Sequence, residues 1–225
     1  MSIFLRCVFF FAFVLLSVAA DPDQPQTMKK MITRLSGEAV KNDAAALRPR
    51  TLYRAAKKYL RLEEEADPNI GWHRLIVMNE PDSWLINLED QTGRHYLDKG
   101  PEFYTKAPIF WGSDGKPESD FEGLEIGEEK EFFGSARARS LGTRTVEGNK
   151  CKALSIVKGH SEVILYLEEK TEKPYQIDLL KDGRSIESLR YLSYEAELPF
   201  DPSLFEPPKS VMMMPGNAEL DAVPK

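Results

Sequence analysis

A series of apolar runs between Glu131 and Glu197 constrains the fold more than any other feature of the sequence. Turn-forming stretches separate the runs: "VEGN", "KGHS", "EEKTEK" and "KDGR". Strands that follow one another about every dozen residues, with no helix between them, form an antiparallel meander. We therefore predict consecutive antiparallel strands. The predicted strands contain the runs "KEFFG", "KCKALSIV", "EVILYL", "PYQIDLL" and "SIESLRYLSY".

Earlier in the chain, two short β-forming runs flank a turn. "WHRLIVM" and "SWLINLE" are separated by "NEPD", and "RHYLD" follows "DQTG". Aromatic and β-branched residues bounded by such turns predict hairpins. Residues 99–130 contain repeated prolines and glycines, so we expect an irregular insertion there.

The N-terminal region indicates helix instead. Met28, Met31, Ile32, Leu35 and Ala39 recur at helical spacing, which predicts an amphipathic helix over residues 28–39. The stretch "TLYRAAKKYL" is ambiguous, and a helix there is expected to give way to a strand near Tyr59. Together these elements predict an α+β protein.

The predicted strands leave one apolar face to be covered. In "YQIDL", apolar side chains alternate with Gln176 and Asp178, so a single sheet would bury one face. The predicted helix over 28–39 is one cover. The stretch "LPFDPSLFEPPKS" is a second, because Asp201 and Pro202 favour one helical turn that presses Leu204 and Phe205 onto the sheet. A simple tie-down of the C-terminus explains the same residues.

Residues 1–20, "MSIFLRCVFFFAFVLLSVAA", predict a cleaved secretory signal peptide. A transmembrane anchor is the competing interpretation, but the apolar run is shorter than the ~20 residues of a bilayer span. We expect residues 21–211 to form one domain and residues 212–225 a flexible tail. The formal charge of −6 argues against a nucleic-acid partner.

No arrangement of residues in the sequence predicts catalysis, a metal or a cofactor. "GHSEV" differs from the nucleophile elbow because Val163 replaces its second glycine. His73 and His95 share no spacing with carboxylates or thiols that would suggest a zinc site. Cys151 is interpreted as a small residue facing the core. We therefore expect a binding protein rather than an enzyme.

Aromatic and aliphatic residues of the predicted strands and of the C-terminal turn are the candidates for lining an apolar ligand cavity. The candidates are Trp72, Trp84, Ile86, Leu88, Tyr175, Ile177, Leu179, Leu204 and Phe205.

The C-terminal third resembles the LolA-like family of periplasmic lipoprotein carriers and outer-membrane lipoprotein-sorting proteins. The resemblance covers about residues 131–211. It rests on "TVEGNKCKALSI" and on "KPYQIDLLKDGRSIESLRYLSYEAELPFDPSLFEPPKSV", with its Asp-Gly hairpin, long strand and D-P-S-x-F turn. "WLINLEDQTGRHYLD" is a looser match to the family's middle hairpins.

This resemblance implies a strongly curved antiparallel sheet, an unclosed half-barrel, whose concave apolar face is covered by helices. It implies a periplasmic protein that binds lipid or lipoprotein acyl chains, without catalytic residues, and that takes part in outer-membrane lipoprotein sorting. An envelope sensor or scaffold that binds a protein partner is the alternative. In the carriers an arginine holds the lid closed, and Arg74 is one candidate for that role here.

Overall fold

The computed structural model describes residues 24–112 and 116–216, and within them twelve strands form one sheet. The predicted signal peptide lies outside the described residues, as do residues 217–225 of the predicted tail. The strands are β1 (Thr27–Ser36), β2 (Arg50–Ala55), β3 (Tyr59–Glu64), β4 (Arg74–Asn79), β5 (Asp82–Asn87), β6 (Thr92–Leu97), β7 (Arg139–Val146), β8 (Asn149–Lys158), β9 (Ser161–Glu168), β10 (Pro174–Lys181), β11 (Arg184–Pro199) and β12 (Met212–Pro215).

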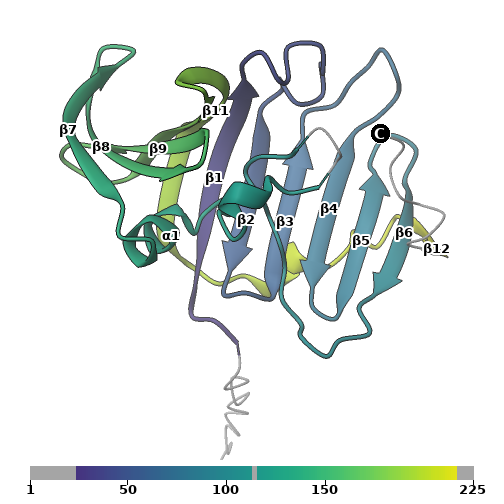
Figure 1. Cartoon of the computed structure of the whole chain (residues 1–225). Coiled ribbons are helices and arrows are strands. Elements are labelled where there is room, and N and C mark those ends of the chain that lie inside the picture. Colours follow the sequence, from purple (N-terminus) through teal and green to yellow (C-terminus); the bar gives the residue numbers. More distant parts are fainter. Residues whose placement is uncertain (1–23, 113–115, 217–225) are drawn as a thin grey trace, which may run out of the picture.

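The sheet is open and almost wholly antiparallel. Its order is β12-β6-β5-β4-β3-β2-β1-β11-β10-β9-β8-β7, and only the β12–β6 pair is parallel. The pairing of β1 with β11 joins the N-terminal hairpins to the C-terminal meander (Figure 1). The predicted open antiparallel sheet is confirmed. The strand β12 lies in the segment that the sequence assigned to the tail.

β1 replaces the helix predicted over residues 28–39. Met31 and Leu35 face one side of the sheet, whereas Met28 packs on the other side. Both register shifts in the pairing of β1 with β11 place the extra residue in β11, so the side chains of β1 alternate between the two faces without a break. A strand that is apolar on both faces therefore produces apolar spacings that imitate a helix.

Two further predictions of local structure were wrong. The stretch expected to begin as a helix near Leu52 forms the hairpin β2–β3, whose turn places Ala56 at φ 45°. Conversely, "KEFFG", expected to be a strand, lies within helix α1 (Glu129–Ser135). Acidic residues in the first turn of α1 favour a helix start, and Phe133 is buried in the core.

Residues 105–112 and 116–138, here called the cover, lie on one face of the sheet, here called the inner face (Figure 1). Their regular structure is limited to a 3₁₀ turn at Ser119–Phe121 and to α1. The irregular insertion was therefore predicted correctly, but helices were expected to cover this face. The cover supplies the buried side chains Ala107, Ile109, Phe110, Phe121, Leu124, Ile126 and Phe133.

Residues 200–216, here called the strap, cross the opposite, outer face and end as β12. The predicted turn is confirmed: Pro202–Phe205 forms a 3₁₀ turn, and the Asp201 carboxylate accepts a hydrogen bond from the Ser203 amide at 3.0 Å. Phe205 is fully buried and its ring packs against Tyr59 and Phe200. Further along, Val211 and Met213 of the strap pack on Leu75, Val77 and Ile86.

The helices of the described residues are short. None of them is long and apolar enough to cross a membrane.

Replacing Phe205 by alanine is expected to destabilise the protein by about 3–5 kcal/mol, because the change leaves a cavity between the strap and the outer face. For a chain of this size, thermal unfolding should shift downward by more than about 5 °C. Differential scanning calorimetry measures the shift.

Met212→Ala is the matched control, since Met212 lies in the strap but is 65% exposed. Its melting temperature should stay within about a degree of wild type. Equal melting of the Phe205→Ala protein and wild type would show that the strap does not stabilise the sheet.

Candidate functional site

Arg54 fixes the cover to the sheet. It lies on β2, and alternation along the strand points it to the inner face beside Leu52. Its side chain is only 4% exposed. The guanidinium donates hydrogen bonds to the Ile126 carbonyl oxygen at 2.9 Å and to a Glu125 carboxylate oxygen at 2.5 Å. Because both acceptors belong to the cover, this contact holds the cover against the centre of the sheet.

Lys29 on β1 adds a second cation to the same contact. Its ammonium donates to the Gly127 carbonyl oxygen and lies 3.4 Å from a Glu128 carboxylate oxygen. Gly127 has φ +87°, and a Cβ there would lie 3.1 Å from the Met31 methyl group, so the close approach requires glycine. Lys29, Arg54, Glu125 and Glu128 are here called the latch.

A buried carboxyl group lies next to the latch. Glu129 is 1% exposed and accepts hydrogen bonds from the Tyr191 hydroxyl group and from the Gly127 amide. Burial raises the pKa of Glu129 to about 7, although both hydrogen bonds oppose that shift. Burial also raises the pKa of the Tyr191 phenol, and the nearby Glu129 adds to the increase. The folded protein therefore binds a proton at Glu129 more tightly than an exposed carboxyl group would.

Polar contacts also hold the opposite end of the cover. Ser161 donates to an Asp120 carboxylate oxygen at 2.7 Å, and Lys181 forms an ion pair with Glu118 at 2.9 Å. Glu187 on β11 is buried near this end, and burial raises its pKa to about 7 against the opposing charge of Arg50. The cover is thus held by polar groups at both ends and by apolar side chains between them.

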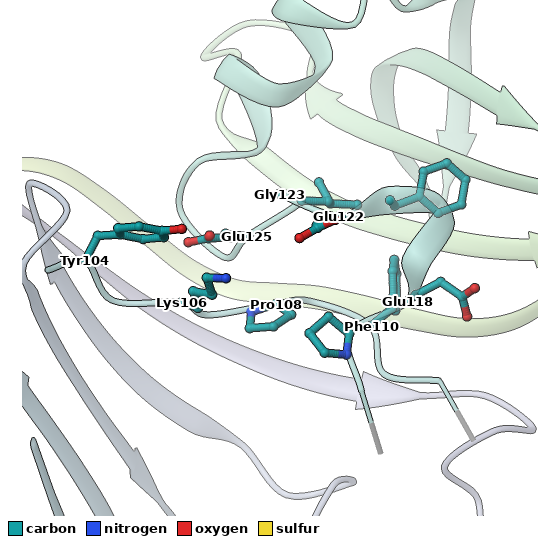
Figure 2. Close-up of a pocket in the computed structure, with 11 residues that line it drawn as sticks. Tyr104, Lys106, Pro108, Phe110, Glu118, Glu122, Gly123 and Glu125 are labelled. Atoms are coloured by element: carbon teal, nitrogen blue, oxygen red, sulfur yellow. The ribbon is translucent and has the colours of Figure 1, made fainter. Parts of the chain in front are cut away.

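A cavity of about 160 Å³ opens within the cover (Figure 2). Pro108, Phe110 and Leu124 provide apolar surface, while Lys106 and Glu122 are among its polar lining residues. The cavity is formed by cover residues and by Tyr104 just before them. Among the described residues, none of those that line this cavity belongs to a strand of the sheet.

Two other cavities border α1. One, of about 560 Å³, lies beside the latch and is lined by residues of both charges, including Lys29, Arg54, Glu128 and Glu131. Within the described part of the chain, the buried Nε of Arg54 makes no hydrogen bond, and its ion pair with Glu128 is 3.7 Å long. The other cavity, of about 240 Å³, lies between α1 and the strands β8 and β9.

The structure divides seven of the nine predicted cavity residues between the two faces. Ile177 and Leu179 are fully buried on the inner face and belong to the same core cluster as the cover. Trp84, Ile86 and Leu88 pack on the outer face under the strap. Leu204 and Phe205 are part of the strap itself. Binding of a ligand by these residues stays a prediction, and only Ile177 and Leu179 are placed under the cover.

Trp72 and Tyr175 lie apart from both groups. Trp72 is 36% exposed and forms an isolated bridge with Asp67. The Tyr175 ring lies under the Arg190 guanidinium, 3.3 Å from its centre. Their predicted role in a cavity is likewise untested.

The residues considered as metal ligands or as a reactive thiol do not form a common site. His73 lies 3.2 Å from Glu63, whereas His95 lies 2.6 Å from Asp82 and stacks on Trp84. In residues 24–112 and 116–216, no three potential metal ligands gather. Cys151 is fully buried, as interpreted from the sequence, and burial raises the pKa of its thiol.

Sequence reasoning missed the latch. Arg74, the candidate lid arginine, instead donates to both carboxylate oxygens of Glu64, at 2.9 and 2.5 Å. The sequence did not indicate Arg54 as a contact of the cover, because the stretch around it was interpreted as the start of a helix. Read as a strand, "TLYRA" places Arg54 on the same face as Leu52, where an inward arginine needs an acidic or carbonyl partner.

Comparison with known proteins found no matching family model and no matching curated protein. Among solved structures, an uncharacterized conserved protein of Thermus thermophilus aligns with a TM-score of 0.49 and 10% identity, over 85% of this chain and 91% of that chain. The MucA/MucB complex of Pseudomonas aeruginosa aligns at 0.44 and 11%, over 84% of this chain and 58% of that chain.

A domain of Vibrio parahaemolyticus that is named as an outer membrane lipoprotein-sorting protein domain aligns with a TM-score of 0.34 and 12% identity. The alignment covers 82% of this chain and 91% of that chain. With TM-scores below 0.5, none of these pairs is similar enough for a function to be transferred.

Glu129 should make the stability of the protein decrease as the pH rises from about 4.5 to about 7. Its pKa in the folded protein, about 7, exceeds the value of about 4.5 for the unfolded chain. The folded state therefore binds the proton more tightly, and this stabilisation is lost as the pH passes the folded pKa. The free energy of unfolding should fall by roughly 3 kcal/mol for a pKa shift of this size. Urea unfolding of wild type and of Glu129→Gln gives the free energy of unfolding of each protein across this pH range. The difference between the two proteins is the contribution of Glu129.

Glu131→Gln removes the same charge from a side chain that is 63% exposed. Its difference from wild type should be nearly constant with pH. A pH-independent difference for Glu129→Gln would contradict the assignment.

Arg54→Met should loosen the cover without unfolding the sheet. Hydrogen bonds to charged groups contribute about 1.5–3 kcal/mol each. The backbone amides of Ile109 and Ile126, which are bonded within the cover, should therefore exchange with deuterium about tenfold faster or more. Hydrogen exchange with mass spectrometry measures this.

Arg74→Gln is the comparison, because Arg74 contacts Glu64 within the sheet. The cover amides should exchange in it as in wild type. If the two variants have the same effect on these amides, Arg54 is not the residue that holds the cover.

Proposed function

We propose that the protein is a periplasmic carrier that binds an acyl chain of a lipid or lipoprotein on the inner face of its sheet. The observation that carries the proposal is the composition of the inner face and its cover. The sheet presents an apolar surface that includes Met31, Leu52 and Ile177, and a largely irregular segment buries it. An acyl chain would occupy the position of part of that segment.

The free energy gained by burying an acyl chain is comparable with that gained by burying the side chains of the cover. Burying a large aliphatic or aromatic side chain contributes about 1.5–3 kcal/mol. Six large side chains of the cover are buried against the sheet: Ile109, Phe110, Phe121, Leu124, Ile126 and Phe133. Burying an alkyl chain contributes about 0.8 kcal/mol per methylene, or on the order of 10 kcal/mol for a chain of about fourteen carbons. A chain of this length can therefore replace several of these contacts.

The latch gives the exchange a point of control. Arg54 and Lys29 hold the cover through two carbonyl oxygens and the carboxylates of Glu125 and Glu128. Because the apolar contacts of cover and ligand are of similar strength, these few polar contacts decide which of the two occupies the inner face. The family resemblance suggested Arg74 as the arginine that holds the lid closed. In this proposal Arg54 has that role instead.

The periplasmic location is part of the proposal and is supported by the leader-like sequence of residues 1–20. Fractionation of cells that express the chain with and without these residues would test it. Recovery of the full-length form in the inner membrane would contradict it.

A second candidate function is binding of a protein partner at β7. This strand is the open edge of the sheet beyond β8, and nearly all of its residues are exposed. An unpaired edge can accept an added strand. The bulge between Ser140 and Gly142 and the arginines of β7 are, equally, ordinary protection of an edge. A photo-reactive residue at position 143 that cross-links a partner, while one at position 110 does not, would favour this function.

Acyl binding can be measured with monotetradecanoylglycerol, a single-chain lipid without charge. Native mass spectrometry of the delipidated protein should show one bound molecule. Hydrogen exchange of the cover should rise on binding, because the chain displaces cover side chains, and the exchange of β3 and β4 should not. Binding that leaves the cover protected, or no binding at all, would contradict a carrier function on the inner face.

A further inference from the structure

The cavity between α1 and the strands β8 and β9 has the lining expected of an amphiphile site. Its apolar residues are Phe133, Ala138, Leu154 and Leu167, and its volume is about 240 Å³. Phe133 and Leu167 are also members of the main core beneath the cover. The apolar wall of the cavity is therefore continuous with the inner face.

The charged residues of this cavity are both cations. Lys130 and Arg137 line it, and no carboxylate does. Within residues 24–112 and 116–216, neither side chain forms an ion pair or a hydrogen bond. The charge of Lys130 contributes to the lowered pKa of Glu172, after the larger effects of the hydrogen bond and the charge of Lys152. Lys130 also lines the cavity beside the latch, whose lining contains carboxylates, whereas Arg137 lines only the cavity between α1 and the strands β8 and β9.

Lys130 and Arg137 lie near opposite ends of α1, and both line this cavity. Lys130 lies in the first turn of α1, whereas Arg137 follows the helix at φ 51°, with its amide bonded to the Gly134 carbonyl oxygen at 3.2 Å. This left-handed residue ends the helix and keeps Arg137 among the lining residues. An anion at the opening would meet two positive groups, with apolar side chains behind them.

We propose that this cavity binds the head and first methylenes of a single-chain anionic amphiphile, a fatty carboxylate or an alkyl phosphate, with Lys130 and Arg137 as the head-group residues. The alkyl chain continues past Phe133 toward the inner face. The site is thus the portal of the acyl-binding face. The inference rests on the proposed function in one respect, that the chain reaches the inner face.

The test compares three ligands that share one chain length: tetradecanoate, tetradecyl phosphate and monotetradecanoylglycerol. Isothermal titration calorimetry on the delipidated protein, below the micelle concentrations, gives their affinities. The two anions should bind about tenfold more tightly or better than the neutral glyceride, because charge-assisted hydrogen bonds of this kind correspond to such a factor. The two anions together distinguish a carboxylate site from a phosphate site.

Two variants locate the binding. Lys130→Gln with Arg137→Gln should remove the preference for anions and leave the affinity for the glyceride unchanged. Gly134→Leu should weaken all three ligands, because it fills the cavity. A Cβ at Gly134 would meet no heavy atom within 4 Å, and leucine favours a helix more than glycine does, so this variant is expected to fold.

Arg144→Gln with Lys150→Gln is the matched control. It removes one arginine and one lysine from the β7–β8 hairpin, away from the lining of this cavity. The anion preference should persist in it. Preference for anions that survives the Lys130 and Arg137 changes, or equal loss in the control, overturns the head-group assignment while leaving the carrier function intact. Absence of binding by all three ligands to wild type overturns both.

Discussion

Burial of both faces of one sheet is the constraint on which the rest of this structure depends. β1 to β5 carry apolar side chains on the inner face, where Met31 and Leu52 lie, and on the outer face, where Val77 and Ile86 lie. A single sheet cannot bury either face by itself. The chain supplies two covers from different regions: the irregular cover on the inner face and the strap on the outer face.

The two covers are attached by different physical means. The strap is fixed by Phe205 at one place and by strand pairing of β12 at another, so its contacts are apolar and backbone contacts. The cover has additional buried ionisable groups, since Arg54 and Glu129 each lie at its contact with the sheet. Removing one partner of such a group leaves the other unpaired in a place of low dielectric, which is costly. Polar contacts of this kind favour one defined position of the cover over many loosely packed ones.

The sequence predicted those features that depend on local patterns. The meander from β8 to β11, the hairpin β4–β5 and the 3₁₀ turn at Pro202 follow from turn residues and alternation, whereas β7 was not among the predicted strands. It failed where tertiary contacts decide. Two apolar faces concealed β1, and "KEFFG" lies in a helix whose Phe133 is buried in the core. The latch was not predictable, because Arg54 and Glu125 are far apart in the chain and come together only when the cover folds back.

The position of Glu129 connects the packing of the cover to its electrostatics. The carboxyl group is enclosed by Gly127 and Tyr191, next to the residues that bind Arg54 and Lys29. When it ionises, a second negative charge enters the region of Glu128 without a direct cation of its own, since Lys29 has only a minor effect on its pKa. Ionisation therefore opposes burial of α1, while the latch favours it. The cover is held against the sheet by the balance of these two effects, and a change in either one alters the access of an apolar ligand to the inner face.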